Sequence, residues 1–187
     1  MNALPQLWLP ILVAAALVYV ASTLIHMVFK WHNSDYRKLA NEEEVQAVLR
    51  KGGPPAPGQY VFPHCADMKA MRDEAVVKKF VEGPVGFLTV VKSGPPKMGG
   101  TLVLWFLYNL VIALIAAAIA LQIYGLPGNA HAAGHLVGLV TFLTYAGGSV
   151  QSGIWMGRPW GSVLKDLLDA LIYGVVSALA FWWLWPA

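Results

Sequence analysis

The sequence has very few charged residues for its length. Only 12% of its 187 residues are Asp, Glu, Lys or Arg, whereas 57% are hydrophobic and the mean hydropathy is +0.56. A soluble domain needs more polar surface than this composition can supply. The shortage of charge therefore argues against an ordinary soluble protein and predicts an integral membrane protein.

Cysteine and the common catalytic motifs are also scarce. Cys65 is the single cysteine, which excludes an intrachain disulfide and suits a reducing compartment. The sequence contains no Gly-rich phosphate loop, no serine nucleophile elbow and no HExxH pattern, so we predict no enzyme activity. Acidic residues alternate with the basic ones, which favours contact with a lipid surface and predicts no nucleic-acid partner.

Long apolar runs are abundant by contrast. Four of them, residues 7–29, 101–124, 130–150 and 167–185, have the length of about 20 residues that crosses a bilayer as a helix. The sequence therefore predicts an all-α membrane protein, a bundle of four transmembrane helices. Residues 1–30 form the first membrane helix, 31–99 a loop domain, and 100–187 the other three membrane helices. No basic residue precedes the first run, so we expect it to be kept rather than cleaved as a signal peptide.

The basic residues indicate the orientation. All 13 Lys and Arg lie in two segments, eleven between residues 30 and 97 and two between the third and fourth runs. Residues 1–6, 125–129 and 186–187 contain none. By the positive-inside rule, the 31–99 loop should face the cytoplasm and both termini should lie outside.

The loop between the first two runs has the pattern of a small, mostly helical domain. Residues 41–50 predict an amphipathic helix with Asn41 as N-cap and Glu44 in a capping box. Residues 73–83 predict a second helix that ends at Gly83, and residues 58–63 read as extended chain. We expect the apolar residues 84–91 to lie in the membrane interface.

Several motifs together resemble those of a known set of proteins. The chain carries LIHM with HNSDYRKL, QYVFPH, EGPVGF, YAGGSVQSGIW with GRPW, and KDLLDALIYG. This joint pattern covers most of the chain and resembles a widespread family of uncharacterised bacterial four-span membrane proteins. The resemblance implies the fold and a bacterial cytoplasmic membrane, but no activity. Ala40 stands where that family usually has a proline, which loosens only a helix start.

Two groups of residues could bind a metal ion. His131 and His135 share one helical face at the outer end of the third run and could hold a metal ion or a haem. The favoured alternative is a pair of interfacial histidines behind the N-cap Asn129. His64 and Cys65 lie near an aspartate and two methionines, a soft donor set for copper, but a single thiol favours packing roles.

The segment YAGGSVQSGIW is rich in small residues. Gly147 and Gly148 are predicted to form the closest contact of the third helix with the fourth, near Gly174 and the alanines at 170 and 178. Alternatively, the glycines break the helix and expose carbonyl groups to a solute, as in discontinuous transporter helices. Packing is the favoured interpretation.

Two polar residues lie inside the apolar runs. His26 is one turn before Lys30, and Asp169 lies inside the start of the fourth run, at a comparable depth. A carboxylate in the membrane is expensive unless it has a partner, so we expect the two side chains to meet. The pair is either a structural clamp, which is favoured, or a proton or ion relay.

The sequence lacks a complete catalytic or ligand set but has a charged loop on one side and eight tryptophans. It predicts a structural or accessory subunit of a larger membrane assembly, with the loop as a docking element. The expected partners are the lipid bilayer and other membrane subunits or further copies of the chain. The alternatives are a small ion or solute transporter or channel and, third, a metal- or haem-binding redox subunit. No cofactor is identified.

Overall fold

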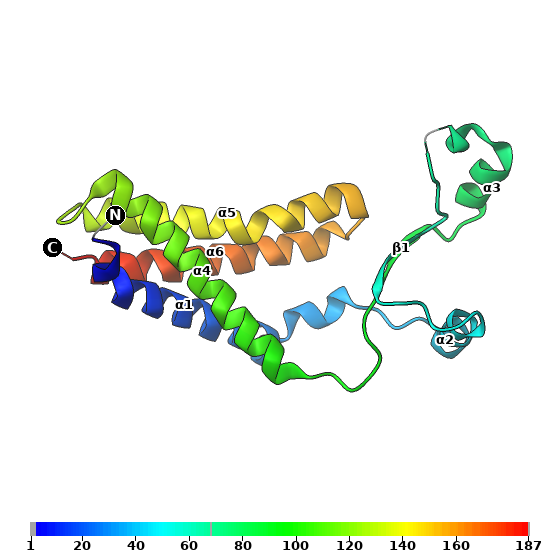
Figure 1. Ribbon diagram of the computed structural model, residues 1–187, viewed down its shortest axis with the longest axis horizontal. Helices are drawn as coiled ribbons and strands as arrows, with labels where there is room; N and C mark the ends of the chain where they lie inside the picture. Colours follow the sequence, from blue (N-terminus) through cyan, green and yellow to red (C-terminus); the bar gives the residue numbers. More distant parts are fainter. Residues whose placement is uncertain (1–2, 68, 187) are drawn as a thin grey trace. The chain divides into compact units, whose positions relative to one another are not determined.

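The computed structural model describes residues 3–67 and 69–186 (Figure 1). The structure is 72% helical. Within the described residues, four helices are long and apolar enough to cross a membrane: Leu4–Phe29, Met98–Tyr124, Ala130–Met156 and Trp160–Leu184. The prediction of a multi-pass helical membrane protein is confirmed at this level.

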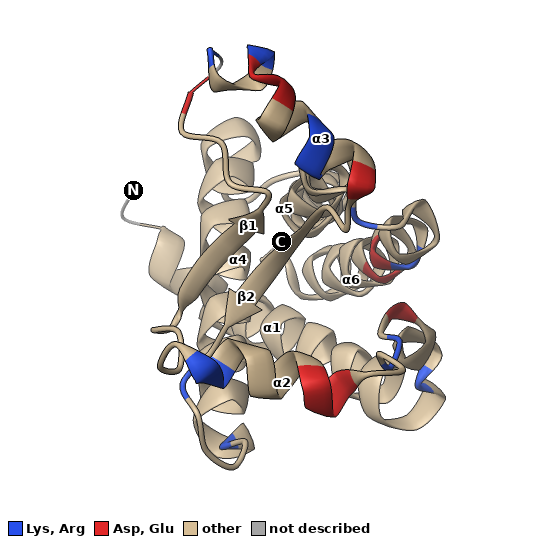
Figure 2. Cartoon of the chain, turned by 90° about the vertical axis from the view of Figure 1, so that its right-hand side faces the viewer, with Lys and Arg blue, Asp and Glu red and all other residues tan. Residues whose placement is uncertain are grey.

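The first of these helices is composite. A short 3-10 turn, η1 (Leu4–Leu7), leads into α1 (Trp8–Thr23), which continues as a π-helical turn, η2 (Leu24–Phe29). The other three are α4 (Met98–Tyr124), α5 (Ala130–Met156) and α6 (Trp160–Leu184). In Figure 2, α1, α4 and α5 are tan along their lengths, because they contain no Lys, Arg, Asp or Glu. A helix satisfies its own backbone hydrogen bonds, so such apolar segments are stable in lipid.

The ends of α5 and α6 follow local sequence signals. The Asn129 side chain caps α5 by accepting a hydrogen bond from the Ala132 N–H, as predicted. The apolar run ends at residue 150, but α5 continues to Met156 and stops at Gly157 in a left-handed conformation (φ 64°). Pro159 precedes Trp160, the first residue of α6.

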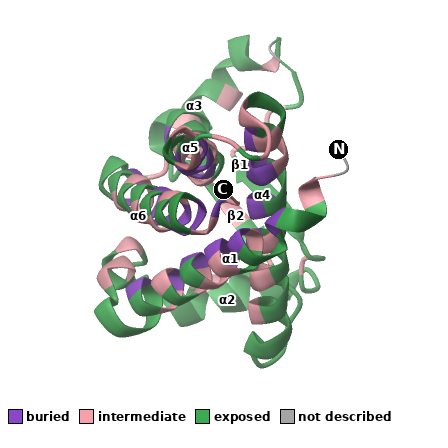
Figure 3. Ribbon diagram, turned by 90° about the vertical axis from the view of Figure 1, so that its left-hand side faces the viewer, coloured by how far each residue is buried: buried purple, intermediate pink, exposed green. Residues whose placement is uncertain are grey.

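The four membrane-length helices pack as one compact unit of residues 1–37 and 97–187, which we call the helix unit. Within it, α5 packs along α6, α1 contacts both α6 and α4, and α4 contacts α5. In Figure 3 the buried residues lie on the sides of these helices that face one another. Figure 1 shows the beginning of the first helix, the end of α6 and the turn between α4 and α5 at one end of the helix unit, which we call the terminal end. The opposite end, where η2 stops and α6 begins, is the loop end.

The closest contact between α5 and α6 lies nearer the terminal end than predicted. A Cβ atom added at Gly138 would lie 2.9 Å from the Gly174 carbonyl oxygen, and one added at Gly134 would lie 2.7 Å from the Ala178 oxygen. Gly147 and Gly148 have no atom within 4 Å of such a Cβ position. The predicted contact of Gly147 and Gly148 is therefore wrong, whereas Gly174 does lie at the helix contact.

Residues 38–96 form a second compact unit. It contains α2 (Glu42–Lys51), α3 (Glu74–Glu82), a 3-10 turn η4 (Ala70–Arg72), and two antiparallel strands, β1 (Gly58–Phe62) and β2 (Gly86–Val90). Gly58 pairs with Val90 and Phe62 with Gly86. The prediction of extended chain at β1 is confirmed, while the expected interfacial segment 84–91 supplies β2. Asn41 precedes α2 without a side-chain cap, whereas Asp73 caps α3.

Candidate functional site

The chain turns immediately after the first of the membrane-length helices. Lys30 adopts a left-handed conformation (φ 56°), and its N–H bonds to the Ile25 carbonyl at 3.0 Å, which closes η2. The next residues form a short 3-10 helix, η3 (Trp31–Asp35), which contacts α6. This turn brings His32 and Asp35 back beside His26, which lies on η2.

The first turns of α6 supply the facing side chains. Lys165, Asp166 and Asp169 lie within four residues of one another, a spacing that keeps them on neighbouring positions of one helix. Figure 2 shows the charged residues of α6 gathered near one of its ends. We call the resulting cluster the loop-end centre; its members are His26, His32, Asp35, Arg158, Lys165, Asp166 and Asp169.

His32 connects the two sides of the centre. Its Nδ1 lies 2.7 Å from Asp35 Oδ2, and its Nε2 lies 3.0 Å from Asp169 Oδ2. The side chains of Asp35 and Asp169 are 6% and 7% exposed, so the imidazole bridges two buried carboxylates. An ionised carboxylate only accepts hydrogen bonds, so His32 donates from Nδ1 to Asp35.

Asp35 is held in its ionised form. Lys165 Nζ donates to Asp35 Oδ1 at 2.6 Å, and the same ammonium donates to the Trp31 carbonyl and to Ser34 Oγ. Burial raises the pKa of Asp35, but hydrogen bonds from Lys165 and His32 outweigh it and lower the pKa to about 2. Asp35 is therefore a permanent anion at neutral pH.

A second ion pair closes the other side of the centre. The Arg158 guanidinium donates to both oxygens of Asp166. Ser149, on α5, also donates to Asp166 and accepts from Arg158. This bidentate arrangement joins the ends of α5 and α6 and satisfies the Asp166 carboxylate.

His26 completes the centre from the first membrane helix. Its Nδ1 lies 3.0 Å from the Ser22 carbonyl, and its Nε2 lies 3.8 Å from Asp169 Oδ2. The imidazole stacks on that of His32, with ring centroids 4.6 Å apart and planes 1° from parallel. The predicted neighbours His26 and Asp169 thus face each other, but Asp169 is closer to His32.

The charges of the centre do not balance. Three carboxylates face two permanent cations, Arg158 and Lys165, which leaves one net negative charge when both histidines are neutral. Moreover, the Nε2 lone pair of a neutral His32 would point at the ionised Asp169. A proton or a metal ion between these atoms removes both conflicts. Among the described residues, His26, His32 and Asp169 are the one set of three such side chains close enough to hold a metal ion.

A cavity of about 420 Å³ adjoins the centre within the helix unit. His26 and Asp169 line it together with aromatic residues of α4, α5 and α6. Polar groups continue from there into the interior, since Tyr145 packs against the Tyr173 ring at 5.2 Å and donates to Asn109 Oδ1 at 2.6 Å. Asn109 is 2% exposed.

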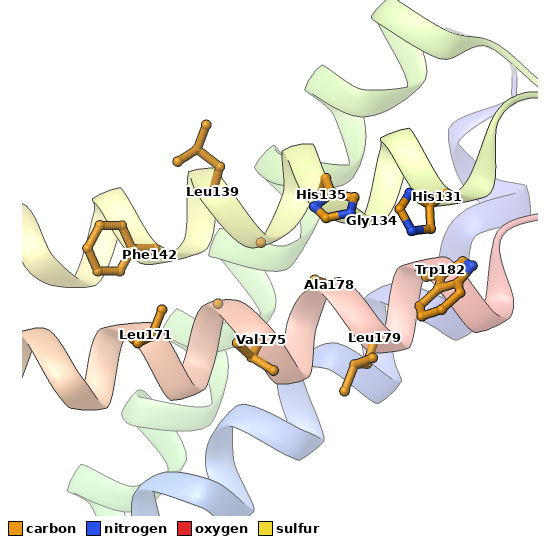
Figure 4. Close-up of a pocket in the computed structure, with 12 residues that line it drawn as sticks. His131, Gly134, His135, Leu139, Phe142, Leu171, Val175, Ala178, Leu179 and Trp182 are labelled. Atoms are coloured by element: carbon orange, nitrogen blue, oxygen red, sulfur yellow. The ribbon is translucent and has the colours of Figure 1, made fainter.

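His131 and His135 lie at the terminal end instead. Their ring centroids are 4.5 Å apart, and His131 meets Trp182 edge-on at 5.0 Å. Figure 4 shows both histidines on α5 along an apolar groove of about 520 Å³ between α5 and α6. Among the described residues, no His, Cys, Asp or Glu joins them to make a set of three metal donors.

His64 and Cys65 lie in the unit of residues 38–96. The Cys65 thiol donates to the Asp67 carbonyl at 3.1 Å, which is a local turn contact. Met68, which the sequence placed near them, lies outside the described residues. Within the described part of the chain, His64 and Cys65 do not belong to a set of three metal donors either.

Sequence reasoning missed most of the loop-end centre. It paired His26 with Asp169 from their depth but gave no role to His32 or Asp35, because nothing in the sequence signals a turn at Lys30. A non-glycine residue with positive φ is uncommon, so the turn at Lys30 was not expected. The i, i+3 spacing of His32 and Asp35 was the one available signal.

Comparison with known proteins does not assign the chain to a family. No family model matches the sequence, and neither the curated proteins nor the solved structures contain a significant match. The resemblance to four-span bacterial membrane proteins therefore remains a prediction.

Proposed function

We propose that the protein is a small membrane transporter or relay for a cation, which it takes up at the loop-end centre. The observation that supports this best is the excess of three carboxylates over two permanent cations in a centre that opens onto a cavity. Ionisable residues at membrane depth are rare and usually mark ion or proton pathways. A structural clamp alone would be expected to balance its charges, as Arg158 and Asp166 do.

The polar groups beyond the cavity support a path toward the interior. Tyr173, Tyr145 and Asn109 follow one another from Asp169 inward. Asn109 Nδ2 is buried without a hydrogen-bond partner, which leaves a donor available to a water molecule on this path. An apolar cluster that includes Ala116, Val137 and Phe181 fills the terminal end of the helix unit. Transport would therefore require this cluster to open, as in alternating access.

We further propose the bacterial cytoplasmic membrane as the location, with the loop-end centre and residues 31–99 on the cytoplasmic side. The four helices then form one bundle, and the unit of residues 38–96 is its cytoplasmic domain. The placement of all the basic residues supports this orientation.

The test is ion flux into proteoliposomes. Wild-type protein should carry protons or a divalent cation, read with entrapped pH- and metal-sensitive dyes under an imposed potential. Asp169→Asn keeps the shape but removes the charge and should abolish the flux, whereas Asp169→Glu should retain part of it. His135→Ala, at the terminal end, is the matched control and should transport normally.

Folding of each variant is checked by its elution from a sizing column and by its helical circular dichroism. Flux no greater than that of empty liposomes for every ion tested would reject transport. Equal flux in wild type and Asp169→Asn would remove the loop-end centre from the pathway.

A further inference from the structure

The donor set of the centre suits a particular class of cation. Two imidazoles and one carboxylate are typical ligands of Zn²⁺ and related divalent transition metals. Alkali ions and Mg²⁺ prefer oxygen donors alone. Three protein ligands also leave one coordination position open, toward the cavity that His26 and Asp169 line.

The tautomers of both histidines are already those of metal ligands. His26 donates from Nδ1 to the Ser22 carbonyl, and His32 donates from Nδ1 to the Asp35 carboxylate. Each Nε2 therefore carries a lone pair and lies near Asp169 Oδ2. Histidines that bind metals usually show this outer hydrogen bond to a carbonyl or carboxylate. Asp35, ionised and fixed by Lys165, would orient His32 and raise its basicity.

The distances are close to those of a metal site. One donor atom of each residue lies within 4.8 Å of the others, with 3.0 and 3.8 Å from Asp169 Oδ2 to the two Nε2 atoms. Bonds of about 2.0–2.2 Å to one metal ion place ligand atoms roughly 3–4 Å apart. The two rings must also tilt from parallel so that their in-plane lone pairs converge. The His26 side chain is 51% exposed and has room to turn.

A second, independent feature is the state of Asp169. Its side chain is 7% exposed, and Oδ1 is buried without any hydrogen-bond partner. Leaving a buried charged acceptor unpaired costs several kcal/mol in general. Coordination of a cation by both oxygens of the carboxylate removes that cost, whereas a contact at Oδ2 alone leaves Oδ1 unpaired.

We propose that His26, His32 and Asp169 bind one divalent transition-metal ion of the Zn²⁺ class, with Asp35 as the positioning residue of His32. This inference rests on the proposed cation function and names the cation. Binding the ion turns the net charge of the centre from minus one to plus one, so a small anion or hydroxide fits the open position.

The test is metal binding by the full-length protein in detergent, purified without a histidine tag. Zn²⁺ titration by calorimetry should show one site per chain, and Co²⁺ should give the visible absorption of a coordinated ion. His32→Ala and Asp169→Asn should weaken Zn²⁺ binding by about 100-fold or more, since even outer partners contribute 10–100-fold. Asp35→Asn should weaken it by about 10–100-fold and shift the Co²⁺ spectrum.

His131→Ala and His135→Ala remove the other histidine pair and are the matched controls, so they should bind Zn²⁺ like wild type. Equal binding by wild type, His32→Ala and Asp169→Asn would overturn the site. Absence of Zn²⁺ and Co²⁺ binding together with proton flux that needs Asp169 would overturn the metal but leave the transporter proposal intact. Metal binding without any flux would overturn the transporter proposal but leave the metal site intact.

Discussion

The two most deeply buried carboxylates of the centre have different partners. Asp35 contacts the Lys165 ammonium and the His32 imidazole. Asp169 has only imidazoles beside it, and its Oδ1 has no hydrogen-bond partner. Asp35 therefore has a full set of donors and is suited to holding other groups in place. Asp169 lacks such a set, which supports the proposal that it binds a cation.

The pKa of Asp35 predicts an acid-sensitive contact. The folded pKa of about 2 is lower than the ordinary 3.8, so ionised Asp35 stabilises the folded protein at pH values above about 4. That contribution should be lost as the pH falls from about 4 to about 2. Thermal unfolding in detergent across this range should show the loss, and Asp35→Asn should make the curve flatter there.

Glu43→Gln is the control, because Glu43 is exposed on α2. It should leave the pH dependence of wild type unchanged. If the wild-type and Asp35→Asn curves had the same slope between pH 4 and pH 2, the pKa of Asp35 would be the same in the folded and the unfolded protein.

At the scale of elements, two devices shape the helix unit. Small residues let α5 and α6 approach until backbone atoms meet, as Gly138 and Gly174 do. The left-handed turn at Lys30 ends the first membrane helix and sends η3 back against α6. The first device fixes the α5–α6 pair, and the second one assembles the loop-end centre.

Gly138→Ala should destabilise the protein although alanine is the better helix former. The added Cβ would lie 2.8 Å from the Ala178 Cβ and 2.9 Å from the Gly174 oxygen, so the helices must move apart. Such overpacking costs about 1–3 kcal/mol. Gly148→Ala is the matched control, since its Cβ would meet no atom within 4 Å, and it should unfold at or above the wild-type temperature. Equal behaviour of the two variants would contradict the contact.

Substitutions at Lys30 test the turn. Lys30→Gly should raise the free energy of unfolding by about 1 kcal/mol, because glycine adopts positive φ without the clash of a Cβ atom. Lys30→Val should lower it, because a branched side chain is strongly disfavoured there. Lys30→Ala separates the backbone effect from loss of the charge. A Lys30→Val variant as stable as Lys30→Ala would show that the residue is not left-handed.

At the scale of the whole molecule, the charged residues are distributed unequally between the two ends of the helix unit. The terminal end carries no Lys, Arg, Asp or Glu in residues 1–6, 125–129 and 186–187, whereas the basic residues belong to the loop end and to residues 38–96. An uncharged end crosses a membrane more readily than one rich in Lys and Arg. This asymmetry predicts that the loop end faces the cytoplasm.

Cysteine labelling tests that orientation. With Cys65 replaced by serine, Pro127→Cys in the α4–α5 turn should react with a membrane-impermeant reagent added to intact cells. Native Cys65 should react only after permeabilisation. Position 128 is less suitable, because a Cβ at Gly128 would lie 2.6 Å from two carbonyl oxygens. The reverse labelling pattern would place the loop outside the cytoplasm.

The hypothesis of an accessory subunit also belongs to this scale and remains a prediction. Purification in a mild detergent should then yield companion proteins at a constant ratio, which a harsher detergent removes. If the chain purifies alone and still transports a cation, the accessory-subunit hypothesis is wrong and transport needs no partner protein.

The sequence alone determined the membrane class, the four apolar spans and the asymmetry of charge. These follow from composition and length, because a helix needs about 20 apolar residues to cross a bilayer, and this requirement does not depend on the tertiary contacts of the helix. It also indicated that His26 and Asp169 lie at one depth, since depth along a helix is proportional to residue number.

Only the tertiary structure decided which groups share the loop-end centre and which small residues touch. His32 and Asp35 lie beside Asp169 because the backbone turns at Lys30, and a single left-handed residue leaves no pattern in the sequence. Gly138, rather than Gly147 or Gly148, meets Gly174, because the rotation of α5 about its axis decides which glycines face α6. That rotation is set by packing between helices, which no local run of residues specifies.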